Sequence, residues 1–233
     1  MIGNDIVDLS DPESSRDACH SRFDRRVFRA EEGRSLSTDY SDVQIRWILW
    51  SAKEAAYKAA RRVSAGVVFS PARFVVDLDR SLCGAVWCGT RRWPVRVRID
   101  GDCVHAVVNG DETTAGTLSG VRRLTAAELR DPSEVVRRFA LASIGAELGV
   151  AISELRIEKV DRIPQLVLAG SVGHVELSLS HHGAYAGFAC RNPRIDAAAR
   201  ISRRIAVRKA ARSHDAPHAS ISYPSRAVQG DLR

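Results

Sequence analysis

Three short stretches of the sequence contain polar residues whose types and spacing could support chemistry. The first surrounds Asp5, the second contains Glu54 between two lysines, and the third is the serine- and histidine-rich stretch at residues 177–183. Carboxylates are the ligands that hard divalent cations prefer, while lysine and imidazole groups contact anionic oxygens. Together these residue types favour a site for a negatively charged substrate.

Asp5 lies in a stretch, residues 2–9, that is rich in β-branched residues and predicts a short strand. In such a strand Gly3, Asp5 and Val7 point to one side. A carboxylate among apolar neighbours is costly to bury unless a cation or hydrogen bonds compensate. Taken alone, Asp5 is better explained as a residue that braces a loop.

Glu54 lies in the strongest predicted helix of the chain, residues 43–62, which carries one apolar stripe. Trp50 and Glu54 are four residues apart and share a helix face that borders this stripe. Glu54 and Lys58 have the same spacing. By spacing alone, a solvated ion pair is the better interpretation of Glu54.

The third stretch reads as a strand that ends in a glycine turn, and its side chains alternate between two faces. The core-side face carries Leu177, Leu179 and His181. The opposite face carries Ser178, Ser180 and His182. A single inward histidine is more often structural than functional. Two serines and two histidines before a glycine nevertheless make a good patch for contacting an anion.

The elements that position these residues repeat one order, helices first and then strands. Residues 13–32 predict a helical region, residues 95–99 alternate as a half-buried strand, and residues 109–116 form a polar linker. A helix at residues 132–148 and four further strands follow. The pattern predicts an α+β fold with two similar lobes, residues 1–111 and 112–192, each with helices packed on a small antiparallel sheet. Residues 193–233 form a basic tail, predicted to be flexible.

Composition and charge argue against a nucleic-acid-binding, a membrane-spanning or a secreted protein. The net charge is +7, but residues 191–233 hold ten Lys or Arg and three Asp, so the remainder is balanced and nucleic acid is an improbable partner. No apolar run is long enough to span a bilayer, and the first residues do not resemble a secretory signal. Five cysteines without a metal-binding pattern are read as reduced thiols, which predicts a cytoplasmic protein.

In combination, the three stretches resemble the signature motifs of the 4′-phosphopantetheinyl transferases. The matching segments are residues 3–8, 50–55 and 177–183, and residues 26–32 resemble the segment between the first two motifs. The resemblance implies transfer of 4′-phosphopantetheine from coenzyme A to a serine of an apo carrier protein, with Mg²⁺, releasing adenosine 3′,5′-bisphosphate. It also implies two lobes that form a pseudo-dimer with the site in the cleft between them.

The resemblance assigns roles residue by residue. Asp5 and Glu54 match the metal-binding acids, and Glu54 is also the best candidate for the general base. Lys53 matches a catalytic lysine that contacts phosphate, and Lys58 matches a second lysine on the cofactor side. Ser180 and His181 match residues that line the coenzyme A site.

The sequence departs from the family pattern in two places. Val7 occupies the position where surfactin-type members carry a third acid, so water would complete the metal site. The usual Gly-Lys-Pro is replaced by residues 162–164, and Arg162 is the candidate substitute for the missing lysine at the 3′-phosphate.

The motif order is that of the short holo-acyl-carrier-protein synthases, which are trimers, whereas the length is that of a two-lobed member. We therefore expect a holo-synthase-type enzyme that is a monomer, with a trimer as the alternative. The carrier could belong to fatty acid biosynthesis, polyketide synthesis or peptide synthesis. The alternative functions are a non-catalytic homologue that binds coenzyme A or carrier protein and, from the basic tail alone, a nucleic-acid-binding module.

Overall fold

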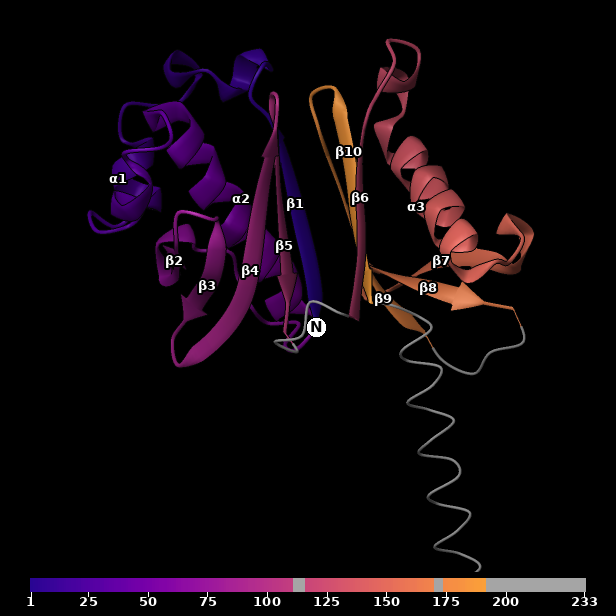
Figure 1. Cartoon of the computed structure of the whole chain (residues 1–233). Coiled ribbons are helices and arrows are strands. Elements are labelled where there is room, and N and C mark those ends of the chain that lie inside the picture. The colour runs from indigo at the N-terminus through magenta and orange to yellow at the C-terminus, as the bar shows by residue number, and fades with distance from the viewer. Residues whose placement is uncertain (111–115, 170–173, 192–233) are drawn as a thin grey trace, which may run out of the picture. The chain divides into compact units, whose positions relative to one another are not determined.

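The strands of the computed structural model form two antiparallel five-stranded sheets, and the structure describes residues 1–110, 116–169 and 174–191 (Figure 1). The first sheet has the order β1-β5-β4-β3-β2 and contains β1 (Ile2–Asp8), β2 (Phe74–Leu78), β3 (Cys83–Cys88), β4 (Arg91–Asp100) and β5 (Cys103–Asn109). The second has the order β6-β10-β9-β8-β7 and contains β6 (Thr117–Arg123), β7 (Leu155–Val160), β8 (Ile163–Leu168), β9 (Val175–His182) and β10 (Tyr185–Arg191). The α+β fold with two lobes is therefore confirmed.

Two long helices cover these sheets, α2 (Asp42–Arg61) on the first and α3 (Pro132–Leu148) on the second (Figure 1). β1 in turn packs against β9 and β10, so the two sheets meet between the helices. The remaining helices are short: α1 (Phe23–Val27), η1 (Pro12–Ser14), η2 (Arg16–Ala18), η3 (Arg34–Leu36), η4 (Pro71–Arg73), η6 (Glu128–Arg130) and η7 (Ile152–Glu154). Within the first 191 residues, the described parts of the chain form one compact unit that contains both sheets.

The start and end of each long helix follow from local sequence. Ser41 accepts a hydrogen bond from the amide of Gln44, and the Gln44 side chain accepts one in return from the Ser41 amide, which makes a capping box at the start of α2. Asp131 caps α3 ahead of Pro132, and Gly149 ends α3 in the left-handed conformation. Both helices therefore begin and end where the sequence predicts, within a residue.

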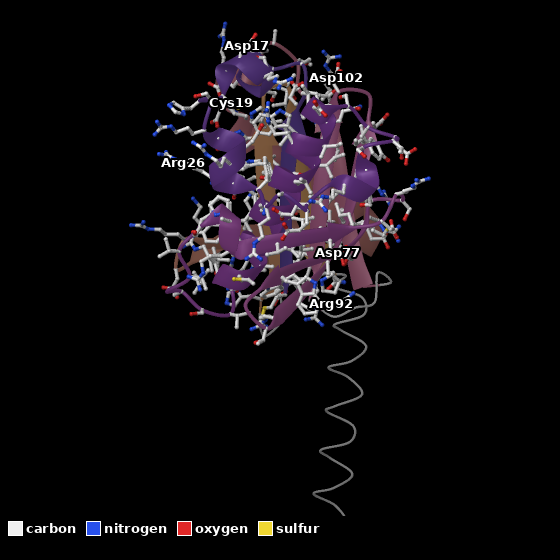
Figure 2. The ribbon with its side chains drawn as sticks, turned by 90° about the vertical axis from the view of Figure 1, so that its left-hand side faces the viewer. Asp17, Cys19, Arg26, Asp77, Arg92 and Asp102 are labelled. Atoms are coloured by element: carbon white, nitrogen blue, oxygen red, sulfur yellow. The ribbon has the colours of Figure 1, made fainter. Side chains whose placement is uncertain are left out.

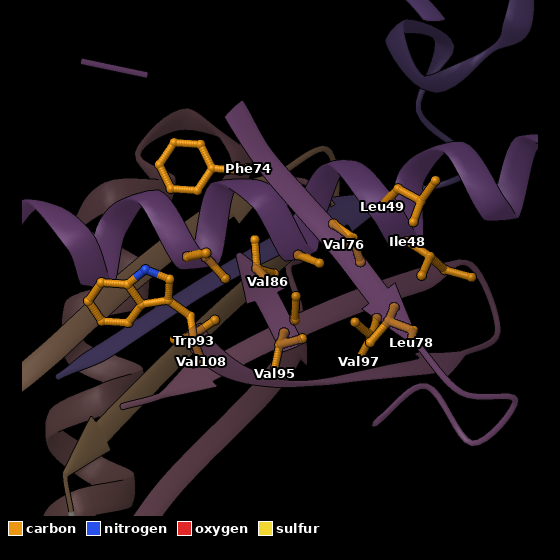
Figure 3. Close-up of a cluster of buried hydrophobic side chains, with 14 of the residues drawn as sticks. Ile48, Leu49, Phe74, Val76, Leu78, Val86, Trp93, Val95, Val97 and Val108 are labelled. Atoms are coloured by element: carbon orange, nitrogen blue, oxygen red, sulfur yellow. The ribbon is translucent and has the colours of Figure 1, made fainter. Parts of the chain in front are cut away.

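The larger hydrophobic core lies between α2 and the first sheet (Figure 3). The alanine-rich face of α2 lets the helix approach the sheet closely, while large side chains fill the space on either side. Figure 3 shows this packing with Ile48 and Leu49 of α2 against the apolar face of the sheet, including Phe74, Val86 and Trp93. The core thereby fixes the position of α2, the helix that carries Glu54.

Two local expectations were wrong. The helical region predicted for residues 13–32 is a series of turns around η1, η2 and the five-residue α1, because side chains such as those of Asp11 and Ser15 cap one short turn after another. β6 was not predicted, because Gly120 and several polar residues obscure its alternation. It nevertheless pairs with β10 along its whole length.

The predicted lobe boundary at residues 111 and 112 and the predicted tail at residues 193–233 lie outside the described residues. β5 ends at Asn109 and β6 begins at Thr117, so the chain passes from one sheet to the other between these residues. Within the described ranges, no helix combines the length and the apolar character needed to traverse a lipid bilayer.

Candidate functional site

Asp5 lies on the face of β1 that packs against α2. Its carboxylate accepts a hydrogen bond from the Lys58 ammonium group at 2.8 Å, and the two side chains are 13% and 30% exposed. Burial raises the pKa of Asp5 above its usual value, and the pair with Lys58 opposes this increase only in part. The compensating cation for this carboxylate is therefore supplied by α2.

Gly3 explains why α2 can come this close to β1. A Cβ atom at Gly3 would lie 2.0 Å from the Ala55 carbonyl oxygen and 2.8 Å from the Ala59 amide nitrogen. Only a residue without a side chain allows this contact. The glycine thus lets the backbone of α2 rest on β1 and brings the residues that flank Ala55 next to Asp5.

Glu54 is the second acid that this contact brings to the site. Burial and, to a smaller extent, the charge of Asp5 raise its pKa to about 7, although Lys58 acts in the opposite direction. The side chain is half-buried, and no ion pair of Glu54 occurs among the described residues. The two carboxylates of Asp5 and Glu54 therefore have only the Lys58 ammonium group beside them among the described contacts. When both carboxylates are ionised, these three residues carry a net negative charge.

The donor set suits a hard divalent cation. Mg²⁺ is commonly held by one or two carboxylates, with water and substrate phosphates as its other ligands. Asp5 and Glu54 provide two such carboxylates, and a bound cation would relieve the repulsion that raises the pKa of Glu54. Within residues 1–110, 116–169 and 174–191, no group of three or more His, Cys, Asp and Glu side chains is arranged to hold a metal. Val7 is 2% exposed and belongs to the core, so this side of β1 offers no third acid.

Lys53 does not join this group. Its side chain is fully buried, and its ammonium group lies 2.6 and 2.9 Å from the two carboxylate oxygens of Glu32, which is also fully buried. The ammonium group donates further to the carbonyl oxygens of Pro71 and Phe74. Glu32 in turn accepts the amide of Val76. The geometry gives Lys53 a structural role, because its donors are already used in tying the segment around Glu32 to β2.

The alternation predicted for residues 177–183 is observed, and it separates the two histidines. Ser178, Ser180 and His182 point toward β1, where they contact Asn4 and Asp8. His181 points the other way and is exposed, with its Nε2 3.2 Å from the hydroxyl of Ser133 in the first turn of α3. The structure therefore places His182, and not His181, on the face of β9 next to β1.

Asn4 and His105 are buried polar residues that were not recognised in the sequence. The Asn4 side-chain amide donates to Ser180 Oγ at 2.8 Å and lies 3.3 Å from His105 Nε2. Burial lowers the pKa of His105 to about 4, so its ring is neutral at pH 7. Asn4 directly precedes Asp5, but its burial depends on the packing of β9 against β1, which sequence periodicity does not reveal.

Arg162 lies in the two-residue turn between β7 and β8, where Asp161 and Arg162 both have positive φ. Its side chain is exposed and makes no described contact with Asp5 or Glu54. A cavity of about 370 Å³ lies between this hairpin and the end of α2, lined in part by Arg61, Arg62 and His174. Arg61 and Arg62, one turn beyond Lys58 at the end of α2, thus place positive charge beside the hairpin that carries Arg162. Arg162 was the residue expected at the 3′-phosphate.

The comparison with known proteins agrees with this geometry. Residues 1–108 match the family model described as the 4′-phosphopantetheinyl transferase superfamily. A search of curated proteins found no match. The matched region contains β1 and α2, and with them both acids and Lys58. Residues 1–108 of this chain therefore form a domain of the 4′-phosphopantetheinyl transferase superfamily.

Proposed function

We propose that this protein transfers 4′-phosphopantetheine from coenzyme A to a serine hydroxyl of an apo carrier protein, with Mg²⁺. The superfamily supports the general reaction, and the arrangement of Asp5, Glu54 and Lys58 supports its use in this chain. That arrangement is the observation on which the proposal depends. It brings together two half-buried carboxylates and an ammonium group from β1 and α2, which lie in close contact because Gly3 has no side chain.

The reaction forms a bond between the serine oxygen and the β-phosphorus of coenzyme A and breaks the bond from that phosphorus to the bridging oxygen. Adenosine 3′,5′-bisphosphate leaves, and the serine proton passes to a base. Glu54 is the candidate base, because it is a half-buried carboxylate beside Asp5 that forms no ion pair among the described residues. Lys58 is the candidate contact for the pyrophosphate.

Asp5 and Glu54 would hold the Mg²⁺ ion, which supplies positive charge where negative charge develops on the phosphate oxygens. Arg61 at the end of α2 and Arg162 on the adjacent hairpin are candidates for binding the adenosine phosphate end of coenzyme A. Arg61 borders the cavity there, whereas the Arg62 guanidinium group donates to backbone carbonyl groups. A guanidinium group suits phosphate in either position.

Carrier proteins present an acidic helix, so a basic surface suits their docking. Arg22, Arg25 and Arg26 in and before α1 are exposed, and Figure 2 shows Arg26 on the outer side of this segment. We propose this basic segment as a docking surface for the carrier. We also propose a monomeric enzyme of the holo-acyl-carrier-protein synthase type in the cytoplasm, and gel filtration that shows a stable trimer would contradict the monomer.

The test is mass spectrometry of an apo carrier protein incubated with coenzyme A, Mg²⁺ and the purified protein. We expect a mass increase equal to one phosphopantetheine arm, lost with Asp5→Asn and with Glu54→Gln. Asp77→Asn is the matched control, because Asp77 is an exposed acid on β2. If several carriers remain unmodified while coenzyme A still binds, the protein is a non-catalytic homologue.

A further inference from the structure

β6 is an edge strand of the second sheet, and no described strand pairs with its free edge. The Leu124 amide donates to the Ala184 carbonyl oxygen, and these two residues continue the register in which β6 pairs with β10. Antiparallel pairing alternates between residues that bond to the neighbouring strand and residues that do not. The even-numbered residues of β6 therefore bond to β10. The odd-numbered residues point their N–H and C=O groups to the free edge, and they are Thr117, Ser119, Val121 and Arg123.

Little in β6 would prevent a further strand from pairing with this edge. Charged side chains, bulges and prolines are the usual devices that protect an edge strand. β6 pairs with β10 over its whole length without a bulge, contains no proline and has no charged residue before Arg122. The opposite edge of the same sheet, β7, carries Arg156, Glu158 and Lys159. β6 is therefore the edge of this sheet that is open to strand addition.

The space beside the free edge lies over the outer face of the first sheet. β1 and β5 pack against the second sheet, and β4 is the next strand beyond β5. A cavity of about 240 Å³ lies there, with Thr117 and Ser119 of β6 on one side and Pro94, Arg96 and Arg98 of β4 on the other. Neighbouring strands lie about 4.8 Å apart in a sheet, so a strand added to β6 would cover this part of β4.

The two arginines give this face a positive charge. Val95 and Val97 are buried in the core under α2, so Arg96 and Arg98 point to the outer face, where both are exposed. Neither arginine forms an ion pair or hydrogen bond with the described residues, including Asp100 at the end of the same strand. Residues two apart in a strand are separated by about 7 Å. Acidic side chains two apart in an added strand would have the same spacing.

We propose that the free edge of β6 binds an extended segment of a partner protein in which two acidic side chains alternate with apolar ones. The segment adds a sixth strand to the second sheet, its backbone pairs with the odd-numbered residues of β6, and its carboxylates contact Arg96 and Arg98. This surface and the pair of Asp5 and Glu54 lie on opposite faces of the first sheet, so the proposal is independent of the proposed function.

Charge distinguishes this partner from the other segments that could occupy the edge. A second copy of the chain would bring another β6, which contains two arginines and no acid. Residues 191–233 hold ten Lys or Arg and three Asp. Both would place positive charge against Arg96 and Arg98, whereas an acidic segment is attracted to them.

The test measures binding of fluorescein-labelled peptides to the full-length protein by fluorescence anisotropy. The probe is Thr-Val-Glu-Val-Glu-Val-Thr, in which both acids lie on one face of an extended chain. The control peptide has glutamine in place of both glutamates, so it keeps the alternation and loses the charge. The unfolding temperature of each protein variant is measured on the same samples.

We expect the unaltered protein to bind the probe about 10-fold more tightly than the glutamine peptide, the effect of two exposed ion pairs. The double variant Arg96→Gln and Arg98→Gln should lose this preference. The matched control is Arg156→Gln with Lys159→Gln, which removes two exposed charges from β7 and should keep it.

A second variant tests the backbone pairing. Ser119→Pro removes an N–H group that points to the free edge and is not used in pairing with β10, a position at which an edge strand tolerates proline. It should weaken binding of both peptides about 5-fold or more, while the unfolding temperature changes by less than about 4 °C. If this variant does not fold, the arginine variants and the glutamine peptide still decide the question.

The proposal is overturned if the probe does not bind, if the glutamine peptide binds within about twofold of the probe, or if the double arginine variant keeps the preference for glutamate. It is also overturned if folded Ser119→Pro binds the probe as the unaltered protein does. Sedimentation velocity that shows a dimer, lost in Ser119→Pro, would assign the edge to a second copy of the chain and overturn the proposal as well. Failure of phosphopantetheine transfer would leave each of these results unchanged.

Discussion

Replacing Glu54 with glutamine should stabilise the protein above neutral pH when no divalent cation is present. The pKa of Glu54 is raised from 4.5 to about 7, so the folded state favours the protonated carboxyl group. For such a group, stability is greatest below pH 4.5, decreases as the pH rises from 4.5 to 7, and levels off above 7. The decrease amounts to about 3 kcal/mol, because each pKa unit corresponds to about 1.4 kcal/mol.

Glutamine stays neutral over this range and avoids the decrease. At pH 8 in EDTA, the free energy of unfolding of Glu54→Gln should therefore exceed that of the unaltered protein by about 1–3 kcal/mol. At pH 4.5 the two proteins should agree within about 0.5 kcal/mol. Unfolding by urea can be followed by the fluorescence of the four tryptophans, of which Trp47 and Trp93 are buried in the core.

Adding Mg²⁺ should reverse the order at pH 8. Binding to the folded state stabilises the unaltered protein increasingly as the Mg²⁺ concentration rises above the dissociation constant. The variant has lost one of the two carboxylate ligands and gains less. Glu31→Gln is the control, because Glu31 is exposed and its replacement should change stability by less than about 0.5 kcal/mol at either pH. A variant no more stable than the unaltered protein at pH 8, or a difference that is independent of pH, would refute the reasoning.

Three further predictions concern the contacts that support the site. Gly3→Ala should abolish transfer and lower stability, because its Cβ would lie 2.0 Å from a carbonyl oxygen of α2, whereas Gly66→Ala, with open space around it, should be neutral in the same thermal and activity assays. Arg62→Met should cost about 2–4 kcal/mol in urea unfolding, because this guanidinium group donates to backbone carbonyls of Ile2, Pro164 and Leu177 across both sheets. Folding lowers the pKa of His105 from 6.5 to about 4, so the neutral ring contributes stability above pH 6.5 that is lost as the pH falls toward 4. His105→Gln should therefore reduce the pH dependence of the free energy of urea unfolding between pH 6.5 and 4.

Periodicity in the sequence was sufficient for elements whose packing is regular. The predicted helices at residues 43–62 and 132–148 correspond to α2 and α3, because each has one apolar face and strong signals at its ends. β6 was missed, since its edge position tolerates Gly120 and polar residues. The turns before residue 32 were mistaken for helix, because side-chain capping of single turns resembles the start of a helix.

The candidate site was predictable only where residues are close in sequence or belong to a recognised motif. Glu54 and Lys58 follow from helical spacing, and the resemblance joined them to Asp5. The burial of Lys53 was not predictable, because it depends on Glu32 and on carbonyl groups of two residues more than fifteen positions away. The alternation of β9 was predicted correctly, but which of its two faces meets β1 depends on how the two sheets pack.

The seam between the sheets consists of side chains, and this has a consequence for the connectivity of such proteins. Among the described strands no backbone pairing joins one sheet to the other, and β1 is covered instead by Ser178, Ser180 and His182. A seam of this kind sets the alignment of two surfaces without requiring either sheet to come first along the chain. Rearranged genes that encode the two halves in the opposite order, or as two separate polypeptides, could therefore preserve the same seam.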